Sequence, residues 1–147
     1  MKSNCGRERV NINGAVDIDT LQTVTDFTDS MNSQSTIRLF DKLEAKHPEV
    51  KVIHIIVDNA TYYQSPLVQE YLKTSRIKIH FLPGYSPNLN WIERLWKFFK
   101  KKILYNKYYE TFEEFLSTCK SFFRCRTKYR EKLRSLLAEN FHLYQPN

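Results

Sequence analysis

Two acidic side chains stand at positions where carboxylates could share one site. Asp58 directly follows an apolar run at residues 51–57, and Glu93, separated from it by 34 residues, stands near the start of a helical pattern. Mg²⁺ characteristically takes one or two carboxylates together with waters and substrate phosphate. A pair of such ions can activate a water or hydroxyl nucleophile and stabilise the leaving oxygen of an in-line displacement. If the fold brings them together, the two acids indicate divalent-metal chemistry on a phosphate substrate.

Each acid also has a purely structural interpretation. Asp58 and Asn59 are residues that favour turns, because their side chains form local hydrogen bonds to the backbone. Asn90 and Glu93 have the spacing of a capping-box variant, in which the helix dipole stabilises the glutamate. The spacing alone leaves these interpretations open.

Hydrophobic periodicity predicts that an α/β fold positions the two acids. The predicted elements are a β-hairpin from residues 7–19 and 21–27, a helix at 33–47, a strand at 51–57, a helix at 65–73 and a strand at 77–82. The strand at 51–57 is almost continuously apolar, as in a strand buried on both faces. A strand, helix, strand order favours a right-handed unit with parallel strands, which places Asp58 at their carboxyl edge.

A turn-rich loop at residues 84–90 leads into a long helix that carries Glu93 in its first turns. Two further helices are predicted at 112–124 and 128–139. The apolar face of the long helix is formed by Ile92, Leu95, Trp96, Phe99 and Ile103. We expect the loop to return the chain towards the edge where Asp58 lies.

Several other residue types invite functional interpretation. His54 lies inside the apolar run, and a hydrogen-bonded core histidine is favoured there over a ligand. Trp91, Trp96, Phe98 and Phe99 fit a core better than a base-stacking surface. Tyr62 and Tyr63 follow Asp58 closely and could border a site.

Composition narrows the class of protein. The chain has 147 residues, 41% of them hydrophobic, which fits one globular domain with its own core. Three cysteines without a C-x-x-C pair argue against a disulfide framework and a zinc site. With neither an apolar stretch long enough to span a membrane nor a signal-peptide pattern, we expect a soluble cytoplasmic protein.

The positive charge is concentrated in the C-terminal third. The net charge is +7, and residues 94–134 contain 13 Lys/Arg against 4 Asp/Glu. Arg94, Lys97 and Lys101 fall three and four apart along one side of the long helix, and Lys100 and Lys102 broaden this basic side. Such an arrangement is expected to hold a phosphate backbone without reading sequence. A solvated helix face is the alternative. The basic residues between 124 and 134 have the same two interpretations, DNA contact or a solvated helix face, and the sequence leaves both open.

Two sequence blocks resemble a known family. Val-Asp-Asn-Ala at 57–60 and Leu-Pro-Gly-Tyr-Ser-Pro-Asn-Leu-Asn-Trp-Ile-Glu-Arg-Leu-Trp at 82–96 resemble the DDE superfamily of transposases, in its mariner-like bacterial insertion-sequence branch. The second block is long and specific, and the 34-residue gap between the two acids also matches. The resemblance extends from about residue 7 to 102.

The resemblance implies a ribonuclease-H-like fold with a mixed sheet flanked by helices, Mg²⁺ or Mn²⁺ as cofactor, and cut-and-paste movement of a DNA element. The family's second and third catalytic acids map onto Asp58 and Glu93, which become the expected metal ligands. Its first acid belongs on an earlier strand, so we expect this chain to lack that strand, and Asp17 and Asp19 are assigned to a hairpin turn. The expected organisation is a partial catalytic domain, with a core at about 7–104 and a basic helical extension at about 105–147.

Two functions remain in competition. The first is a transposase catalytic-domain fragment acting on transposon ends and target DNA, with a homodimer left open and no membrane partner. The second is an inactive remnant that binds DNA through charge alone, because the first acid is missing from the pattern.

Overall fold

The computed structural model describes residues 10–84, 91–124 and 126–138. In chain order the elements are β1 (Asn11–Val16), β2 (Thr23–Thr28), α1 (Ser33–Lys46), β3 (Ile53–Val57), the 3₁₀ helix η1 (Thr61–Gln64), α2 (Pro66–Lys73), β4 (Ile77–Phe81), α3 (Trp91–Ile103), α4 (Phe112–Arg124) and α5 (Arg126–Ala138). The predicted α/β class is confirmed.

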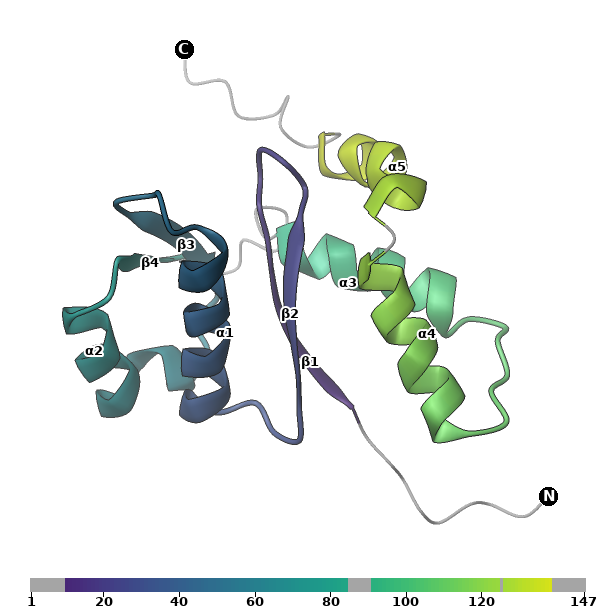
Figure 1. The fold of residues 1–147 in the computed structure, drawn as a ribbon, viewed down its shortest axis with the longest axis horizontal. Coiled ribbons are helices and arrows are strands. Elements are labelled where there is room, and N and C mark those ends of the chain that lie inside the picture. Colours follow the sequence, from purple (N-terminus) through teal and green to yellow (C-terminus); the bar gives the residue numbers. More distant parts are fainter. Residues whose placement is uncertain (1–9, 85–90, 125, 139–147) are drawn as a thin grey trace.

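The described strands form two small sheets. β1 pairs with β2 in antiparallel fashion, and β3 pairs with β4 in parallel, with Ile53 opposite Ile77 and Val57 opposite Phe81. The predicted parallel strand, helix, strand unit is therefore confirmed. In Figure 1 the hairpin lies between α1 on one side and α3 on the other, while α2, β3 and β4 lie beyond α1.

Local sequence signals set the boundaries of the first two helices. The Asn32 side chain accepts a hydrogen bond from the Ser35 amide at 2.9 Å, and the Ser35 hydroxyl accepts one from the Asn32 amide at 2.8 Å. This reciprocal capping box begins α1. Ser65 caps α2 by accepting from the Val68 amide, and Pro66 occupies the first turn, where its missing N–H has no cost.

Two apolar clusters hold these elements together, and the hairpin contributes to both. One cluster joins α3, α4 and α5; its buried members are Leu95, Phe98, Phe99, Ile103, Cys119, Phe122 and Leu133. The other joins α1, α2 and β4 through Leu39, Phe40, Leu43, Val68 and Ile77. Ile12 and Val16 pack on the first cluster and Ala15 and Val24 on the second, so the hairpin links the two halves of the molecule.

The expectation that β3 is buried on both faces is wrong. Ile53 and Ile55 pack on the α1 and α2 side, whereas His54 and Ile56 are exposed, Ile56 by 55%. In the described residues β3 has one sheet neighbour and helices against one face, so alternate side chains meet solvent. The interpretation of His54 as a core residue fails for the same reason.

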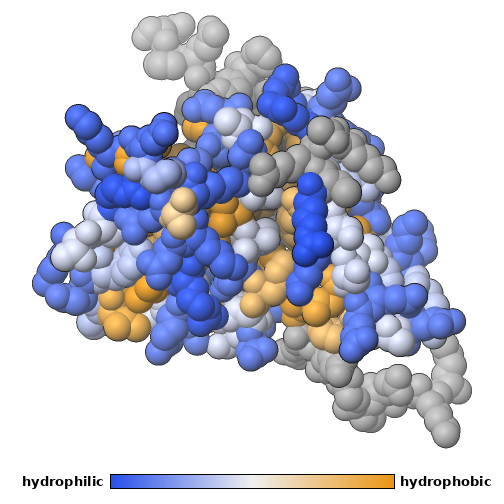
Figure 2. Space-filling view, in the orientation of Figure 1, coloured by the Kyte–Doolittle hydropathy of each residue, from blue (hydrophilic) through white to orange (hydrophobic). Residues whose placement is uncertain are grey.

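The core interpretation is confirmed for three of the four α3 aromatic residues. Phe98 and Phe99 are buried, and the Trp96 ring packs edge-on against Phe123 at 5.8 Å between centroids. The side chain of Trp91 lies outside the described residues. Hydrophilic residues cover most of the face in Figure 2 and leave separate apolar patches. Among the described residues, no helix has the length and apolar character needed to cross a membrane.

Candidate functional site

Asp58 lies immediately after β3, at the carboxyl end of the parallel strand pair, and its side chain is exposed. One carboxylate oxygen, Oδ1, accepts a hydrogen bond from the Ala60 amide at 3.0 Å. The turn chemistry considered as a structural role is therefore present. It uses one oxygen and leaves the carboxylate at the surface, where it can also bind a cation.

Backbone and side-chain hydrogen bonds join the ends of the two parallel strands beside Asp58. The Leu82 amide donates to the Val57 carbonyl at 2.8 Å, and the Asn59 side-chain amide donates to the Leu82 carbonyl at 3.2 Å. Asn59 thus fixes the direction in which the chain leaves β3. These contacts hold Asp58 at a defined position on the sheet edge.

Two tyrosines of η1 adjoin Asp58. Burial raises the pKa of both Tyr62 and Tyr63, and the negative charge of Asp58 raises each further. The two rings lie 4.7 Å apart between centroids. Both phenols therefore remain protonated at neutral pH and can act as hydrogen-bond donors near the carboxylate.

Glu93 is the third residue of α3, and its side chain is exposed. A carboxylate in the first turn of a helix interacts favourably with the helix dipole, so the structural role considered for it also stands. Asn90, its predicted capping partner, lies outside the described residues. Leu95 packs into the core formed by α3, α4 and α5, and Trp96 packs against Gly14 of β1. These two contacts fix the rotation of α3 and therefore the face that carries Glu93.

The described residues do not by themselves assemble a complete metal site. Among them no hydrogen bond or ion pair joins Asp58 to Glu93, and no group of three or more His, Cys, Asp or Glu side chains is gathered. Each of the two acids is nevertheless exposed, and hard oxygen donors of this type suit Mg²⁺ or Mn²⁺.

The basic residues predicted on α3 are divided between solvent and core. Lys97, Lys100 and Lys101 are exposed, whereas Arg94 is partly buried and has partners of its own. Lys102 turns towards the core, with its ammonium group 5.7 Å from the Phe98 ring centroid. Glu93, Lys97, Lys100 and Lys101 are spaced to share one exposed side of the helix.

The basic residues between 124 and 134 whose side chains are described are exposed. Arg124, Arg130 and Arg134 are exposed, and the Lys132 ammonium group lies 5.8 Å from the Phe98 ring centroid. The side chains of Arg126 and Lys128 lie outside the described residues.

Asp17 belongs to the hairpin turn, as predicted. Its Oδ1 atom accepts hydrogen bonds from the amides of Asp19 at 2.8 Å and Thr20 at 3.1 Å. Burial raises the pKa of Asp17, but these hydrogen bonds outweigh burial and hold the pKa below its usual value. The carboxylate is therefore committed to the turn between β1 and β2.

Sequence reasoning missed a histidine pair on the exposed face of the parallel sheet. His54 Nδ1 lies 2.9 Å from His80 Nε2, a hydrogen-bond distance. The signal is the parallel register, in which Ile56 lies opposite His80. His54 lies two residues before Ile56 and points to the same face of the sheet, so His54 and His80 are diagonal neighbours on that face.

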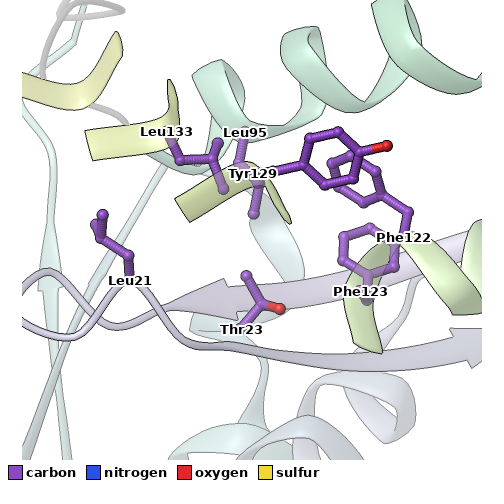
Figure 3. Close-up of a pocket in the computed structure, with 7 residues that line it drawn as sticks. All are labelled: Leu21, Thr23, Leu95, Phe122, Phe123, Tyr129 and Leu133. Atoms are coloured by element: carbon purple, nitrogen blue, oxygen red, sulfur yellow. The ribbon is translucent and has the colours of Figure 1, made fainter. Parts of the chain in front are cut away.

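A small gap lies beside the apolar cluster of α3, α4 and α5. It measures about 20 Å³, room for roughly one water molecule. Figure 3 shows its lining of Leu21, Thr23, Leu95, Phe122, Phe123, Tyr129 and Leu133. A space this small and apolar is a packing defect and holds neither a nucleotide nor a metal.

Comparison with known proteins places these residues in a wider context. A family model described as DDE superfamily endonuclease matches residues 2–116, which include both Asp58 and Glu93. Over 69 residues the chain is 36% identical to the uncharacterized 39 kDa protein of insertion element IS630 from Shigella sonnei. That match covers 46% of this chain and 20% of the relative, so the chain corresponds to a minor part of that protein's length.

Proposed function

Because the chain belongs to the DDE superfamily of endonucleases, we propose that it is part of a transposase catalytic domain that cleaves and joins DNA with divalent metal ions. Its two small sheets and the five α-helices of the described residues are consistent with a ribonuclease-H-like domain. The observation that carries the proposal is the exposed carboxylate of Asp58 at the carboxyl edge of β3 and β4, inside the family match.

In this proposal Asp58 and Glu93 are ligands of Mg²⁺ or Mn²⁺. The Ala60 amide donates to Asp58 Oδ1, and the other carboxylate oxygen would be available to hold the ion. Glu93 approaches from the first turn of α3. Bound divalent ions would supply stabilisation of charge on phosphate oxygens and a lowered pKa for the attacking water or hydroxyl.

A further carboxylate of the site is proposed to come from outside the described residues. Asp17 is assigned to the hairpin turn instead, where its Oδ1 accepts hydrogen bonds from two backbone amides. The partial-domain organisation, with a core at about 7–104 and a helical extension at about 105–147, remains part of the proposal. α4 and α5 share an apolar cluster with α3, which supports a structural role for the extension.

The DNA backbone is proposed to lie along the exposed side of α3. Lys97, Lys100 and Lys101 supply ammonium groups on the same side as Glu93, and Arg94 lies one residue beyond the acid. Contacts to phosphate give affinity without sequence recognition and release condensed counterions. The proposal places the protein with DNA in the bacterial cytoplasm.

Mn²⁺ binding tests the metal site directly. In an ¹⁵N-labelled chain, Mn²⁺ should broaden amide signals around Asp58 and Asn59, and at the start of α3. Asp58→Asn and Glu93→Gln should each weaken this effect at least about tenfold in Mn²⁺ concentration, because each removes one charged ligand. Both side chains are exposed, so thermal stability should hardly change.

The matched control is Asp19→Asn, which removes an exposed carboxylate from a different loop. It should leave the Mn²⁺ response unchanged. Broadening that persists in both the Asp58 and Glu93 variants would rule out the assignment. Metal-dependent nicking of supercoiled plasmid DNA is the second readout, and undiminished nicking by both variants would rule it out as well.

A DNA-binding remnant without cleavage is the second candidate function. The exposed Lys97, Lys100 and Lys101 favour it, because they provide phosphate contacts whether or not the metal site is complete. Salt-dependent DNA binding without any Mn²⁺ response at Asp58 would support this candidate over the first.

A further inference from the structure

Resting on the DNA-binding part of the proposed function, we infer that the turn between α3 and α4 is a stacking platform for unpaired DNA bases. The platform consists of Tyr105 and Tyr108, with Lys100, Lys101 and Lys107 around them. The ligand class is single-stranded DNA, or the unpaired end of a duplex.

The two tyrosines are the most exposed of the large hydrophobic side chains described. Tyr108 is 86% exposed and Tyr105 is 65% exposed, and neither ring packs against another aromatic ring among the described residues. Tyr109, one residue further, behaves differently: its hydroxyl donates to the Ile103 carbonyl at 2.6 Å and its ring packs on Phe115. Tyr109 therefore anchors the turn, while Tyr105 and Tyr108 present free ring faces.

Hydrogen bonds give this turn a defined shape. The Leu104 and Tyr105 amides both donate to the Lys100 carbonyl, at 2.9 and 3.2 Å, and the Lys107 amide donates to the Leu104 carbonyl at 3.3 Å. Asn106 adopts a φ of 57°, a left-handed conformation that asparagine tolerates better than most residues. An ordered turn loses less conformational entropy when it binds a ligand.

Charge on the turn favours a nucleic acid over an apolar protein partner. Lys100, Lys101 and Lys107 are exposed beside the tyrosines. The nearest acidic residue in the sequence is the exposed Glu110, two residues after Tyr108, whose backbone amide donates to the Glu114 carboxylate at 3.1 Å. The three lysines outnumber it, so the turn keeps a positive charge. Aromatic faces combined with lysines are the arrangement that binds single strands, because stacking accepts any base and ammonium groups hold the backbone.

The position of the turn sets a distance from the proposed metal site. The rise of an α-helix puts the end of α3 about 15 Å from Glu93, and the exposed lysines lie along that path. At about 3.4 Å per nucleotide, the rise along a duplex strand, this path corresponds to roughly four nucleotides of paired DNA between the reacting phosphate and the tyrosines. Bases inside a duplex have their faces covered, so the platform selects unpaired ones.

Fluorescence anisotropy of labelled oligonucleotides tests the platform with the 147-residue chain. The Tyr105→Ala/Tyr108→Ala variant should bind a 15-nucleotide single strand about 10- to 100-fold more weakly, with less than about a twofold change for a duplex of the same sequence. Tyr105→Phe/Tyr108→Phe should keep the wild-type affinity, since phenylalanine retains the stacking face. Circular dichroism and the melting temperature should be unchanged, because both side chains are exposed.

The control variant is Lys97→Ala/Lys101→Ala, which should weaken single-strand and duplex binding alike and reduce the salt dependence. Unchanged single-strand affinity in the tyrosine-to-alanine variant would overturn the inference. So would an equal loss for both DNA forms, or a self-association that the alanine variant abolishes, because a second copy of the chain would then be the partner.

This experiment separates the inference from the proposed catalytic role. Anisotropy needs no metal and can be repeated in the Asp58→Asn variant, where the tyrosine effect should persist. A chain that shows tyrosine-dependent single-strand binding but no Mn²⁺ response would retain the platform and lose the catalytic assignment.

Discussion

Trp96 of α3 packs directly over the backbone of Gly14 in β1. A methyl group added at Gly14 would lie 2.9 Å from Cη2 and 3.1 Å from Cζ2 of the indole, and 3.3 Å from the Val24 carbonyl oxygen. The glycine is therefore required for close approach of the helix to the hairpin. Since Glu93 precedes Trp96 by one helical turn, this contact also sets where the carboxylate of Glu93 lies.

We predict that Gly14→Ala destabilises the protein by about 1–3 kcal/mol, because the methyl group overpacks a rigid ring. Thermal or urea unfolding measures the change. Trp96→Phe removes the clashing atoms, so the double variant should lose less stability than the sum of the single variants. Gly84→Ala is the matched control, since a Cβ atom there meets nothing within 4 Å. Equal effects at the two glycines would contradict the packing argument.

Asp26 should give the protein a pH-dependent stability. Its carboxylate is buried and lies 2.8 Å from the Lys42 ammonium nitrogen and 3.3 Å from Arg38 Nε. Burial raises the pKa of Asp26, but the hydrogen bonds and charges of Lys42 and Arg38 outweigh it and hold the pKa below its ordinary value. With a depressed pKa in the folded state, the stabilisation is present above about pH 4 and is lost as pH falls through the folded-state pKa.

Asp26→Asn should therefore lower the free energy of unfolding by about 1.5–3 kcal/mol at pH 7, the range for hydrogen bonds to charged groups. The difference from wild type should shrink steadily between about pH 5 and pH 2, as the wild-type carboxylate is protonated. Urea unfolding at several pH values measures it, with Asp19→Asn as the exposed control. If the difference in free energy of unfolding between wild type and Asp26→Asn did not change with pH, the ion pairs of Asp26 would not be the cause of that difference.

Arg76 connects the end of α1 to the start of β4. Its guanidinium donates to the carbonyls of His47 at 2.6 Å and Glu44 at 2.7 Å, while its backbone amide donates to Glu44 Oε1 at 2.8 Å. Arg76→Ala would leave carbonyls at the helix end without these donors, so we predict a loss of about 2–3 kcal/mol. Calorimetric melting temperatures measure it.

Compared with Arg76→Ala, the variant Arg76→Lys should recover less than half of the lost stability. One ammonium group cannot reproduce the planar guanidinium, which reaches several carbonyls. The control is Lys73→Ala, whose exposed ion pair with Glu70 should contribute less than about 0.5 kcal/mol. Full recovery of stability in Arg76→Lys would show that the positive charge of Arg76 is sufficient and that its hydrogen bonds to several carbonyls are not required.

Local signals made the helices and strands predictable. The Asn32 and Ser65 caps, Pro66 and the apolar period of α3 all act within a few residues, and the observed boundaries follow them. Close contacts between distant segments were not predictable. The Gly14–Trp96 contact, the His54–His80 pair and the exposed face of β3 each depend on which elements meet in space.

The candidate site was predictable to a more limited extent. The periodic pattern anticipated that Asp58 follows a strand and that Glu93 begins a helix, and the structure agrees. Pairing the two acids relied on the resemblance of the surrounding blocks, because 34 residues separate them and the segment 85–90 lies outside the described residues. The metal ligation itself remains a prediction.

Cys119 should report on the integrity of the α3–α5 core. Its side chain is fully buried, and burial raises the pKa of the thiol to about 11. Thiolate is the reactive form, so the folded protein should protect Cys119 from a disulfide reagent such as dithiobisnitrobenzoate. In a Cys5→Ser/Cys125→Ser background, which leaves this single thiol, labelling should be at least about a hundredfold slower than in urea-unfolded protein.

Gly14→Ala should accelerate this labelling, because weakening the contact of α3 with β1 increases the population of open states. The acceleration should correspond to the loss of stability measured by unfolding, at about tenfold per 1.4 kcal/mol. Gly84→Ala should leave the labelling rate unchanged. Rapid, complete labelling of the wild-type thiol while circular dichroism remains native would show that the core does not enclose Cys119. Acceleration without lost stability would place the opening at α4 alone, apart from the hairpin contact.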